Sequence, residues 1–183
     1  LNHLSDVSCV ILDDCLTLVQ KPHGLKFAWN PGGSQIREGV EAPLTSKLLR
    51  QTDILFLNAE EAILFTGQSR NLSREESIRR SLRTGTQCGV KVMCVTDGPH
   101  GAFLSDGKTV FYSPPVQGIE VVDTTGAGDA YAVGVTWGII AGIPLPEALK
   151  AGMLSAASVI GNIGTQAGLL RDTEIRTRLA ATT

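Results

Sequence analysis

The sequence predicts an α/β fold, with a parallel or mixed β-sheet and flanking helices, on three observations. Short apolar runs alternate with stretches of helical pattern along the chain. The run at residues 54–57 is apolar throughout, as in a strand that is buried on both faces. Strong breakers such as Pro-Gly-Gly at residues 31–33 separate the elements. At 183 residues the chain is long enough for one domain with a sizeable core, so residues 1–183 are expected to form a single domain.

The first elements follow from local signals. Residues 7–12 and 26–30 are strand-like, and residues 44–51 predict a short helix. The buried strand at 54–57 ends at Asn58, where a helix begins whose acidic first turn suits the helix dipole. The remaining elements are expected in this order: a helix from residue 73 to about 86 that opens with capping-box spacing, a strand at 90–96, a turn at 97–101, a hairpin of strands 102–105 and 110–113, a helix from about 128 to 141, a helix at 145–160, and a last helix capped by Asp172.

Composition argues against several classes of partner. The chain is 43% hydrophobic and 19% charged, with a formal net charge of −2. It has no basic excess to neutralise a phosphate backbone, so nucleic acid is not an expected partner. The longest nearly apolar stretch, residues 130–143, is shorter than the roughly 18 residues that a membrane span needs. A buried core helix is therefore expected there, and no membrane partner.

The cysteines indicate a reducing compartment. Cys9, Cys15, Cys88 and Cys94 form no Cys-x-x-Cys pair, and their spacing matches neither a zinc site nor a dense disulfide framework. Cys9 and Cys94 lie in apolar strand-like runs, where cysteine acts as a small hydrophobic residue. Residues 1–8 show no apolar signal region. The expected location is the cytoplasm.

The strongest chemical signal is the run Asp-Thr-Thr-Gly-Ala-Gly-Asp at residues 123–129. It follows the apolar pair Val121-Val122 and precedes a helix rich in Ala, Val and Gly, which predicts a strand, a tight turn and a buried helix N-terminus. Consecutive small residues expose backbone N–H groups, and with the positive end of the helix dipole they form an anion hole for a phosphoryl group. Asp129 would lie beside the hydroxyl that attacks this group and can accept its proton.

Other phosphate-binding motifs do not fit this run. A Walker A loop would need a lysine, which does not occur here, and a dinucleotide fingerprint would need a third glycine where Tyr131 stands. A plain glycine turn remains the structural alternative.

The run resembles the Asp-Thr-x-Gly-Ala-Gly-Asp signature of the PfkB family of carbohydrate kinases, with every defining position present. The resemblance implies a three-layer α/β/α ribokinase-like (Rossmann-like) fold. It assigns Asp129 as the catalytic base, and it assigns Gly126, Ala127 and Gly128 as the anion hole.

Asn58-Ala59-Glu60-Glu61 resembles the family's Asn-x-x-Glu motif, after a buried strand and at a helix start. The resemblance implies that Glu61, with Asn58 beside it, holds Mg²⁺ next to the triphosphate, and a carboxylate is a suitable hard oxygen donor. A solvated glutamate in the first turn of a helix is the alternative. Glu60, one residue out of phase, is expected to be the solvated one.

Two further segments resemble the nucleotide side of the family site. Residues 96–101 match Thr-x-Gly-x-x-Gly, which places Thr96 and Gly98 near the ATP phosphates or ribose, with His100 an exposed loop residue. Residues 156–165 resemble the closing segment, which lies beside the adenine and lines a monovalent-cation site. Carbonyl groups there, including that of Gly164, with Asp123 and the carbonyl of Thr125, are candidate ligands for K⁺.

Two weaker patterns leave alternatives open. Asn30-Pro31-Gly32-Gly33 resembles the family's Asn/Asp-Pro turn, but a simple tight turn between sheet and helix is an equal alternative. Arg37 lies too many residues after this turn to be assigned the phosphate contact that an arginine makes in some relatives. The Gly-x-x-x-Gly step at Gly134 and Gly138 predicts close packing of the helix against the sheet.

The resemblance covers only the C-terminal part of the family pattern. An early Asp for the sugar hydroxyls, a Gly-Gly-x-x-x-Asn segment and the small β-sheet lid are not found, so we expect a domain truncated at its N-terminus, with first strands and lid missing. Such a truncation would expose a sheet edge and favour pairing, for example as a homodimer. The leading hypothesis is an ATP-dependent kinase that phosphorylates a sugar hydroxyl. The alternatives are a nucleoside kinase and a non-catalytic fragment that binds nucleotide weakly or serves as an assembly surface.

Overall fold

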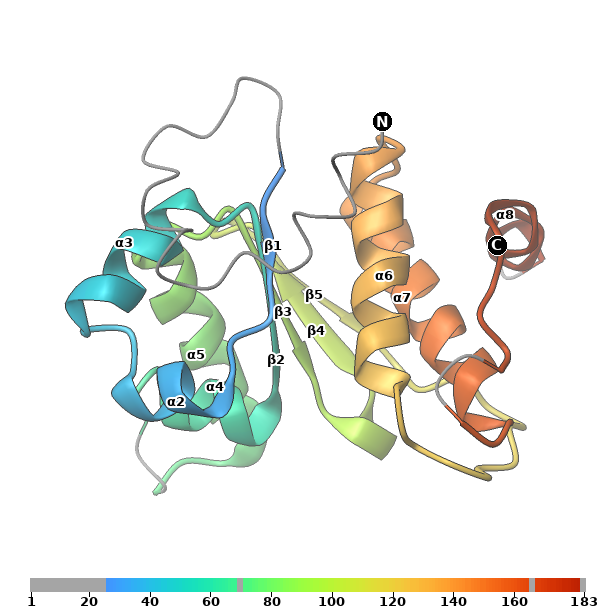
Figure 1. Cartoon of the computed structure of the whole chain (residues 1–183), viewed down its shortest axis with the longest axis horizontal. Helices are drawn as coiled ribbons and strands as arrows, with labels where there is room; N and C mark the ends of the chain where they lie inside the picture. Colours follow the sequence, from blue (N-terminus) through green and yellow to red (C-terminus); the bar gives the residue numbers. More distant parts are fainter. Residues whose placement is uncertain (1–25, 69–70, 165–166, 182–183) are drawn as a thin grey trace.

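A computed structural model describes residues 26–68, 71–164 and 167–181 of the chain. In these residues a five-stranded sheet, in the order β1-β2-β3-β4-β5, lies between two layers of helices (Figure 1). Strands β1 (Ala28–Trp29), β2 (Ile54–Asn58) and β3 (Val92–Thr96) run parallel, and β4 (Ala102–Ser105) and β5 (Val110–Ser113) continue the sheet antiparallel. The predicted α/β fold with a mixed sheet and helices on both faces is confirmed. The strand expected at residues 7–12 lies outside the described residues.

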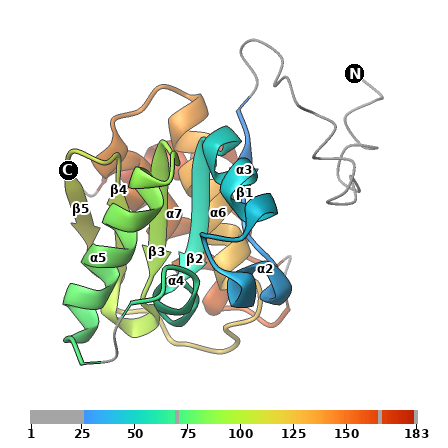
Figure 2. The same ribbon diagram turned by 90° about the vertical axis from the view of Figure 1, so that its left-hand side faces the viewer.

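One face of the sheet is covered by four helices, namely α2 (Gly33–Glu38), α3 (Pro43–Gln51), α4 (Ala59–Phe65) and α5 (Arg74–Gln87) (Figure 2). Alternate residues of a strand point to opposite faces. Leu55, Leu57, Met93 and Val95 therefore share a core with the helices of this layer. Helix α2 was not predicted, because Pro31-Gly32-Gly33 indicated only a breaker. The helix begins at the last residue of that breaker.

The other face packs against α6 (Ala127–Ile140) and α7 (Leu145–Ile160). Ile54, Phe56 and Cys94 point to this side and share a second core with Tyr131 and Leu149. Helix α8 (Asp172–Ala180) lies outside this layer, and the Trp137 indole N–H donates a 2.8 Å hydrogen bond to Asp172. Asp172 was predicted to cap α8, but the N-cap is Arg171 and Asp172 is the first residue of the helix.

The glycines of α6 allow close contact with α7. A β-carbon at Gly134 would lie 2.7 Å from the Ala151 carbonyl oxygen, and one at Gly138 would lie 2.8 Å from the β-carbon of Ala148. Close packing was predicted correctly, but the partner is α7 and not the sheet.

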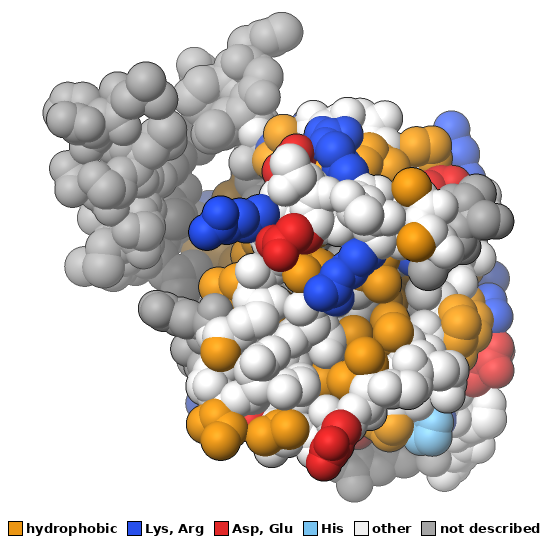
Figure 3. Space-filling model, turned by 90° about the vertical axis from the view of Figure 1, so that its right-hand side faces the viewer, with side chains coloured by type: hydrophobic (Ala, Val, Ile, Leu, Met, Phe, Trp, Pro, Cys, Tyr) orange, Lys and Arg blue, Asp and Glu red, His pale blue; other side chains and the backbone are white. Residues whose placement is uncertain are grey.

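Helix α6 is buried on one side only, so the expectation of a fully buried helix was wrong. Val133 is 63% exposed and Ile140 is 65% exposed. Hydrophobic side chains also reach the surface on the face of the molecule where α6 to α8 lie (Figure 3). Across the described residues, no helix is long and apolar enough to cross a membrane.

The segment at Val121-Val122 and the cysteines differ in how well they match expectation. The strand expected at Val121-Val122 does not form, since both side chains are more than half exposed and the Val122 N–H donates to the carbonyl of Ile160 at the end of α7. Cys94 is a buried free thiol, as expected for a small hydrophobic residue, and Cys88 is also free.

Candidate active site

A cavity of about 550 Å³ lies where β3 ends and α6 begins. Thr96 at the end of β3 and Gly98 in the turn after it line the cavity, and Ala127 and Gly128 line it from the first turn of α6. The start of α6 and the turn after β3 lie at the same edge of the sheet, the lower edge in Figure 1. Two segments that lie about 30 residues apart in sequence, both predicted to contact nucleotide, therefore share one cavity.

The wall of this cavity is mainly apolar and comes from segments on either side of the glycine-rich turn. Ala156, Ala157 and Ile160 of α7 line it, which places part of the predicted closing segment at the cavity. The loop at residues 115–119, between β5 and the glycine-rich turn, lines it as well. No motif in this loop indicates a function, and its Pro-Pro and Gln-Gly steps predict only turns.

The glycine-rich turn exposes the N-terminus of α6. Gly126 caps the helix with a left-handed backbone, φ 81°, which glycine adopts without strain. The Ala127 N–H donates to the Thr124 carbonyl, and a β-carbon at Gly128 would meet nothing within 4 Å. The next amides of a first helical turn have no partner inside the helix, and the helix dipole is positive there. This end of α6 therefore suits an anionic group.

Asp129 lies in this same first turn, and its side chain is exposed. A carboxylate in the first turn is favoured by the helix dipole. It is open to solvent beside the exposed amides of the anion-binding turn. This position fits a group that accepts a proton from a hydroxyl brought to a bound phosphate.

Asp123 joins the glycine-rich turn to the closing segment. Its carboxylate accepts hydrogen bonds from the Thr125 N–H at 2.9 Å and from the Gly164 N–H at 3.2 Å. The Thr125 side chain, followed by these two backbone N–H groups, lowers the pKa of Asp123 below its ordinary value. The three residues predicted to surround a monovalent cation are therefore brought together.

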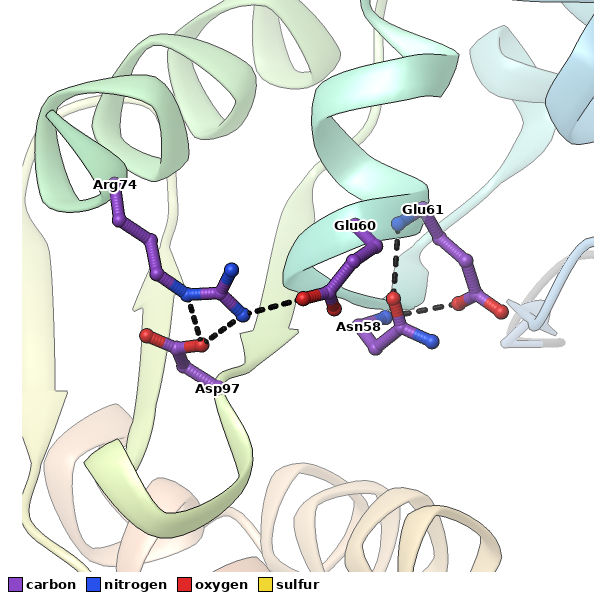
Figure 4. Close-up of polar contacts among 5 residues, drawn as sticks. All are labelled: Asn58, Glu60, Glu61, Arg74 and Asp97. Atoms are coloured by element: carbon purple, nitrogen blue, oxygen red, sulfur yellow. Dashed lines mark hydrogen bonds and ion pairs between the residues drawn. The ribbon is translucent and has the colours of Figure 1, made fainter. Parts of the chain in front are cut away.

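Asn58 and Glu61 form a reciprocal cap at the start of α4. The Glu61 N–H donates to Asn58 Oδ1 at 2.8 Å, and the Asn58 N–H donates to Glu61 Oε2 at 2.9 Å (Figure 4). The cap fixes the Glu61 carboxylate at the carboxyl end of β2. In parallel register Asn58 lies opposite Thr96, so the start of α4, with this carboxylate, adjoins the end of the strand that lines the cavity.

The donor set suits magnesium that is held largely by phosphate and water. No group of three or more His, Cys, Asp or Glu side chains occurs among the described residues. Mg²⁺ keeps several waters and needs only one or two protein carboxylates where phosphates are present. A single capped carboxylate at Glu61 fits that requirement.

Sequence reasoning missed an ionic group beside this cap. Arg74 donates from Nε to Asp97 Oδ1 at 2.6 Å and from Nη2 to Glu60 Oε1 at 2.7 Å (Figure 4). We call these three residues the Arg74 bridge. Glu60 is exposed but not simply solvated, and its hydrogen bond to Arg74 lowers its pKa. The sequence held one indication of this ionic group, because a basic residue at the first position of a helix opposes the helix dipole. His100 is exposed, as expected.

The chain is similar in sequence to known kinases. Residues 32–172 match the family model described as pfkB family carbohydrate kinase. A cytidine kinase from Thermococcus kodakarensis is 31% identical over 66% of this chain and 41% of its own length. A ribokinase from Haemophilus influenzae is 28% identical over 82% of this chain and 46% of its own length. The chain thus spans less than half the length of these relatives.

A solved structure shares the fold. The crystal structure of a probable sugar kinase from Rhizobium etli is 26% identical, with a TM-score of 0.71. It covers 93% of this chain, and the match extends over 48% of the solved chain. The three-layer arrangement seen in Figure 1 is therefore shared with a protein about twice as long.

Proposed function

The chain belongs to the pfkB family of carbohydrate kinases, and on that premise we propose that it forms the nucleotide-binding and phosphoryl-transfer part of an ATP-dependent kinase. The observation that carries the proposal is the shared cavity. It brings Thr96 and Gly98 together with the exposed N-terminus of α6 at Ala127 and Gly128. An apolar wall suits a nucleobase, and a helix N-terminus suits phosphate.

Each candidate residue has a distinct role in this proposal. In the predicted anion hole of Gly126, Ala127 and Gly128, the N–H groups of the two glycines face the transferred phosphoryl group, where negative charge has to be stabilised. The Ala127 N–H donates to the Thr124 carbonyl in this structure and would have to leave it to join them. Asp129 accepts the proton of the attacking hydroxyl. Glu61, oriented by Asn58, holds Mg²⁺, which neutralises phosphate charge when bound.

We also propose a monovalent-cation site at the junction of the glycine-rich turn and the closing segment. Asp123 already orders Thr125 and Gly164 around its carboxylate. K⁺ is bound by oxygen ligands, and the carbonyl groups of these two residues would complete the set with Asp123. Dependence of nucleotide affinity on KCl, with NaCl at equal ionic strength as control, tests this site.

The proposed acceptor is a sugar hydroxyl. A nucleoside is the second candidate, favoured by the 31% identity to a cytidine kinase. The chain matches less than half of its relatives' length, and we propose that it phosphorylates one of these two acceptors. A chain that binds nucleotide without transferring phosphate is the remaining alternative.

Two measurements on the 183-residue chain test this proposal. Isothermal titration with MgATP should give saturable binding at one site, and a panel of sugars and nucleosides with radiolabelled ATP should identify the acceptor. Binding without transfer would support the non-catalytic alternative. The absence of MgATP binding would reject the proposed nucleotide site altogether.

We propose the cytoplasm as the cell compartment and a homodimer as the assembly. The free thiols of Cys88 and Cys94 fit a reducing cytoplasm. Among the described residues β1 is a short edge strand, and such an edge could pair with a second copy in a homodimer. Sedimentation of the purified chain at several concentrations tests this assembly.

A further inference from the structure

The Arg74 bridge connects the two halves of the candidate site. Asp97 directly follows Thr96, the last residue of β3, and directly precedes the cavity residue Gly98. Glu60 directly precedes Glu61, the proposed magnesium ligand. Arg74 reaches both carboxylates from α5, a third element (Figure 4). One side chain therefore links the nucleotide side to the metal side, in addition to the pairing of β2 with β3.

The bridge differs from the other ion pairs of α5. Arg79 pairs with Glu75 and Arg80 pairs with Glu76, each within the same helix. Both partners of these pairs are at least 42% exposed, so solvent screens them strongly. The bridge differs at its Asp97 end, because the Asp97 side chain is only 6% exposed, whereas those of Arg74 and Glu60 are 47% and 71% exposed. A nearly buried carboxylate depends on its partner much more than an exposed one does.

The position of Arg74 is unfavourable for the helix itself. Arg74 is the first residue of α5, where the dipole favours acidic side chains, as at Glu75 and Glu76. Ser73 already caps the helix by accepting a hydrogen bond from the Glu76 N–H. The arginine therefore adds nothing to the local stability of the helix, and its two contacts lie outside it. A residue that opposes a local preference is often one with a functional role.

Asp97 passes this constraint to the turn that lines the cavity. Its backbone N–H donates to the Gly101 carbonyl at 2.8 Å, and its carbonyl accepts from the His100 N–H at 2.9 Å. Asp97 therefore closes the turn at residues 97–101 with its backbone and holds Arg74 with its side chain.

We propose that Arg74 is a positioning residue that aligns the turn after β3 with the start of α4 around one bound MgATP. This inference rests on the proposed nucleotide site. Arg74 touches neither nucleotide nor metal in this role, and it acts through Asp97 and Glu60.

The test compares Arg74→Ala with Arg80→Ala, which removes an exposed ion pair from the same helix. Arg74→Ala should raise the Kd for MgATP roughly 10- to 100-fold, as for other residues that orient ligands of a metal. It should also raise the Mg²⁺ concentration that half-saturates ATP binding, which a general loss of stability would not do. Arg80→Ala should leave both quantities unchanged. Arg74→Lys, which keeps the charge but not the two-pronged contact, should restore part of the affinity.

Hydrogen exchange of the nucleotide-free chain provides an independent measurement. Arg74→Ala should speed amide exchange both in residues 97–101 and at the start of α4, whereas Arg80→Ala should not. Unchanged exchange in Arg74→Ala would overturn the alignment whether or not nucleotide binds. Faster exchange with an unchanged Kd for MgATP would overturn the role in nucleotide binding. Failure of the wild-type chain to bind MgATP would instead reject the proposed nucleotide site, and the role of Arg74 with it.

Discussion

Asn58 lies directly opposite Thr96 in the parallel register of β2 and β3, at the last position of both strands. The carboxyl ends of adjacent parallel strands meet at one edge of a sheet, which is where α/β folds bind their ligands. The residue that orients Glu61 is therefore a cross-strand neighbour of a residue that lines the cavity. The fold alone brings the proposed metal side and nucleotide side together, and local contacts only refine their placement.

Replacing the proposed base separates chemistry from binding. Asp129→Asn should lower turnover roughly 100- to 10,000-fold, because the amide cannot accept the hydroxyl proton. Affinity for MgATP should be almost unchanged, since Asp129 is exposed and lies outside the cavity lining. Steady-state kinetics with the best acceptor and calorimetry with MgATP measure the two effects. The matched control is Glu147→Gln, which removes an acidic group from the first turn of α7. Wild-type turnover in Asp129→Asn would refute the assignment.

Two glycines of α6 should respond in opposite ways to the same substitution. Gly134→Ala should destabilise the fold by about 1–3 kcal/mol, because the new methyl would meet the backbone of α7. Gly128→Ala has open space and should raise stability by up to about 1 kcal/mol, as alanine restricts the unfolded chain. The same methyl would project at the proposed anion hole and should weaken MgATP binding. Urea unfolding measures the stability of the two variants, and calorimetry measures their affinity for MgATP. A Gly128→Ala variant that binds MgATP as tightly as wild type would contradict the anion hole.

The sequence was informative wherever the signal was local. The buried strand β2, the start of α4 and the hairpin around Asp106 each depend on a few adjacent residues, and all three were predicted, although the cap between Asn58 and Glu61 was not. The glycine-rich turn was recognised for the same reason. Its position beside Thr96 followed only from the family resemblance, because periodicity does not reveal which elements meet in space.

The missed features all depend on tertiary contacts. Arg74 and Asp97 are 23 positions apart and meet only because α5 packs beside β3. Val121 and Val122 are apolar enough for a strand, but the Val122 N–H bonds to the end of α7 instead of to a neighbouring strand. Gly134 and Gly138 indicated a close contact without identifying α7 as the partner. In each case the competing interaction came from a segment distant in sequence.

The buried hydroxyl of Tyr131 should be dispensable for stability. Within the described part of the chain it makes no hydrogen bond of ordinary geometry and has only the Cys94 thiol, a weak partner, beside it, and burial, followed by Cys94, raises its pKa well above the ordinary value. Phe56 packs edge-on against the ring, with 6.1 Å between ring centroids, and phenylalanine would keep that contact. Tyr131→Phe should therefore raise the free energy of unfolding by about 1 kcal/mol, because an unsatisfied buried polar group is removed. Equilibrium unfolding in urea measures this change in the free energy of unfolding. Clear destabilisation would mean that the hydroxyl has a partner after all.

The contact between Asp123 and Gly164 should depend on pH in the acid range. The pKa of Asp123 is held below its ordinary value of 3.8 by hydrogen bonds that favour the ionised carboxylate. Its contribution to the ordered turn is therefore fully present above pH 3.8 and is lost as the pH falls through the lowered pKa. The amide proton shifts of Thr125 and Gly164, followed by NMR on acidification, should change together at a midpoint below 3.8.

Asp123→Asn provides the control for this titration. The asparagine does not ionise, so the two amide shifts should lose their common midpoint while the rest of the spectrum titrates as before. If the wild-type amides instead titrate at or above the ordinary aspartate value, Asp123 does not hold the turn to the closing segment. The proposed cation site, which depends on that junction, would then lose its structural basis.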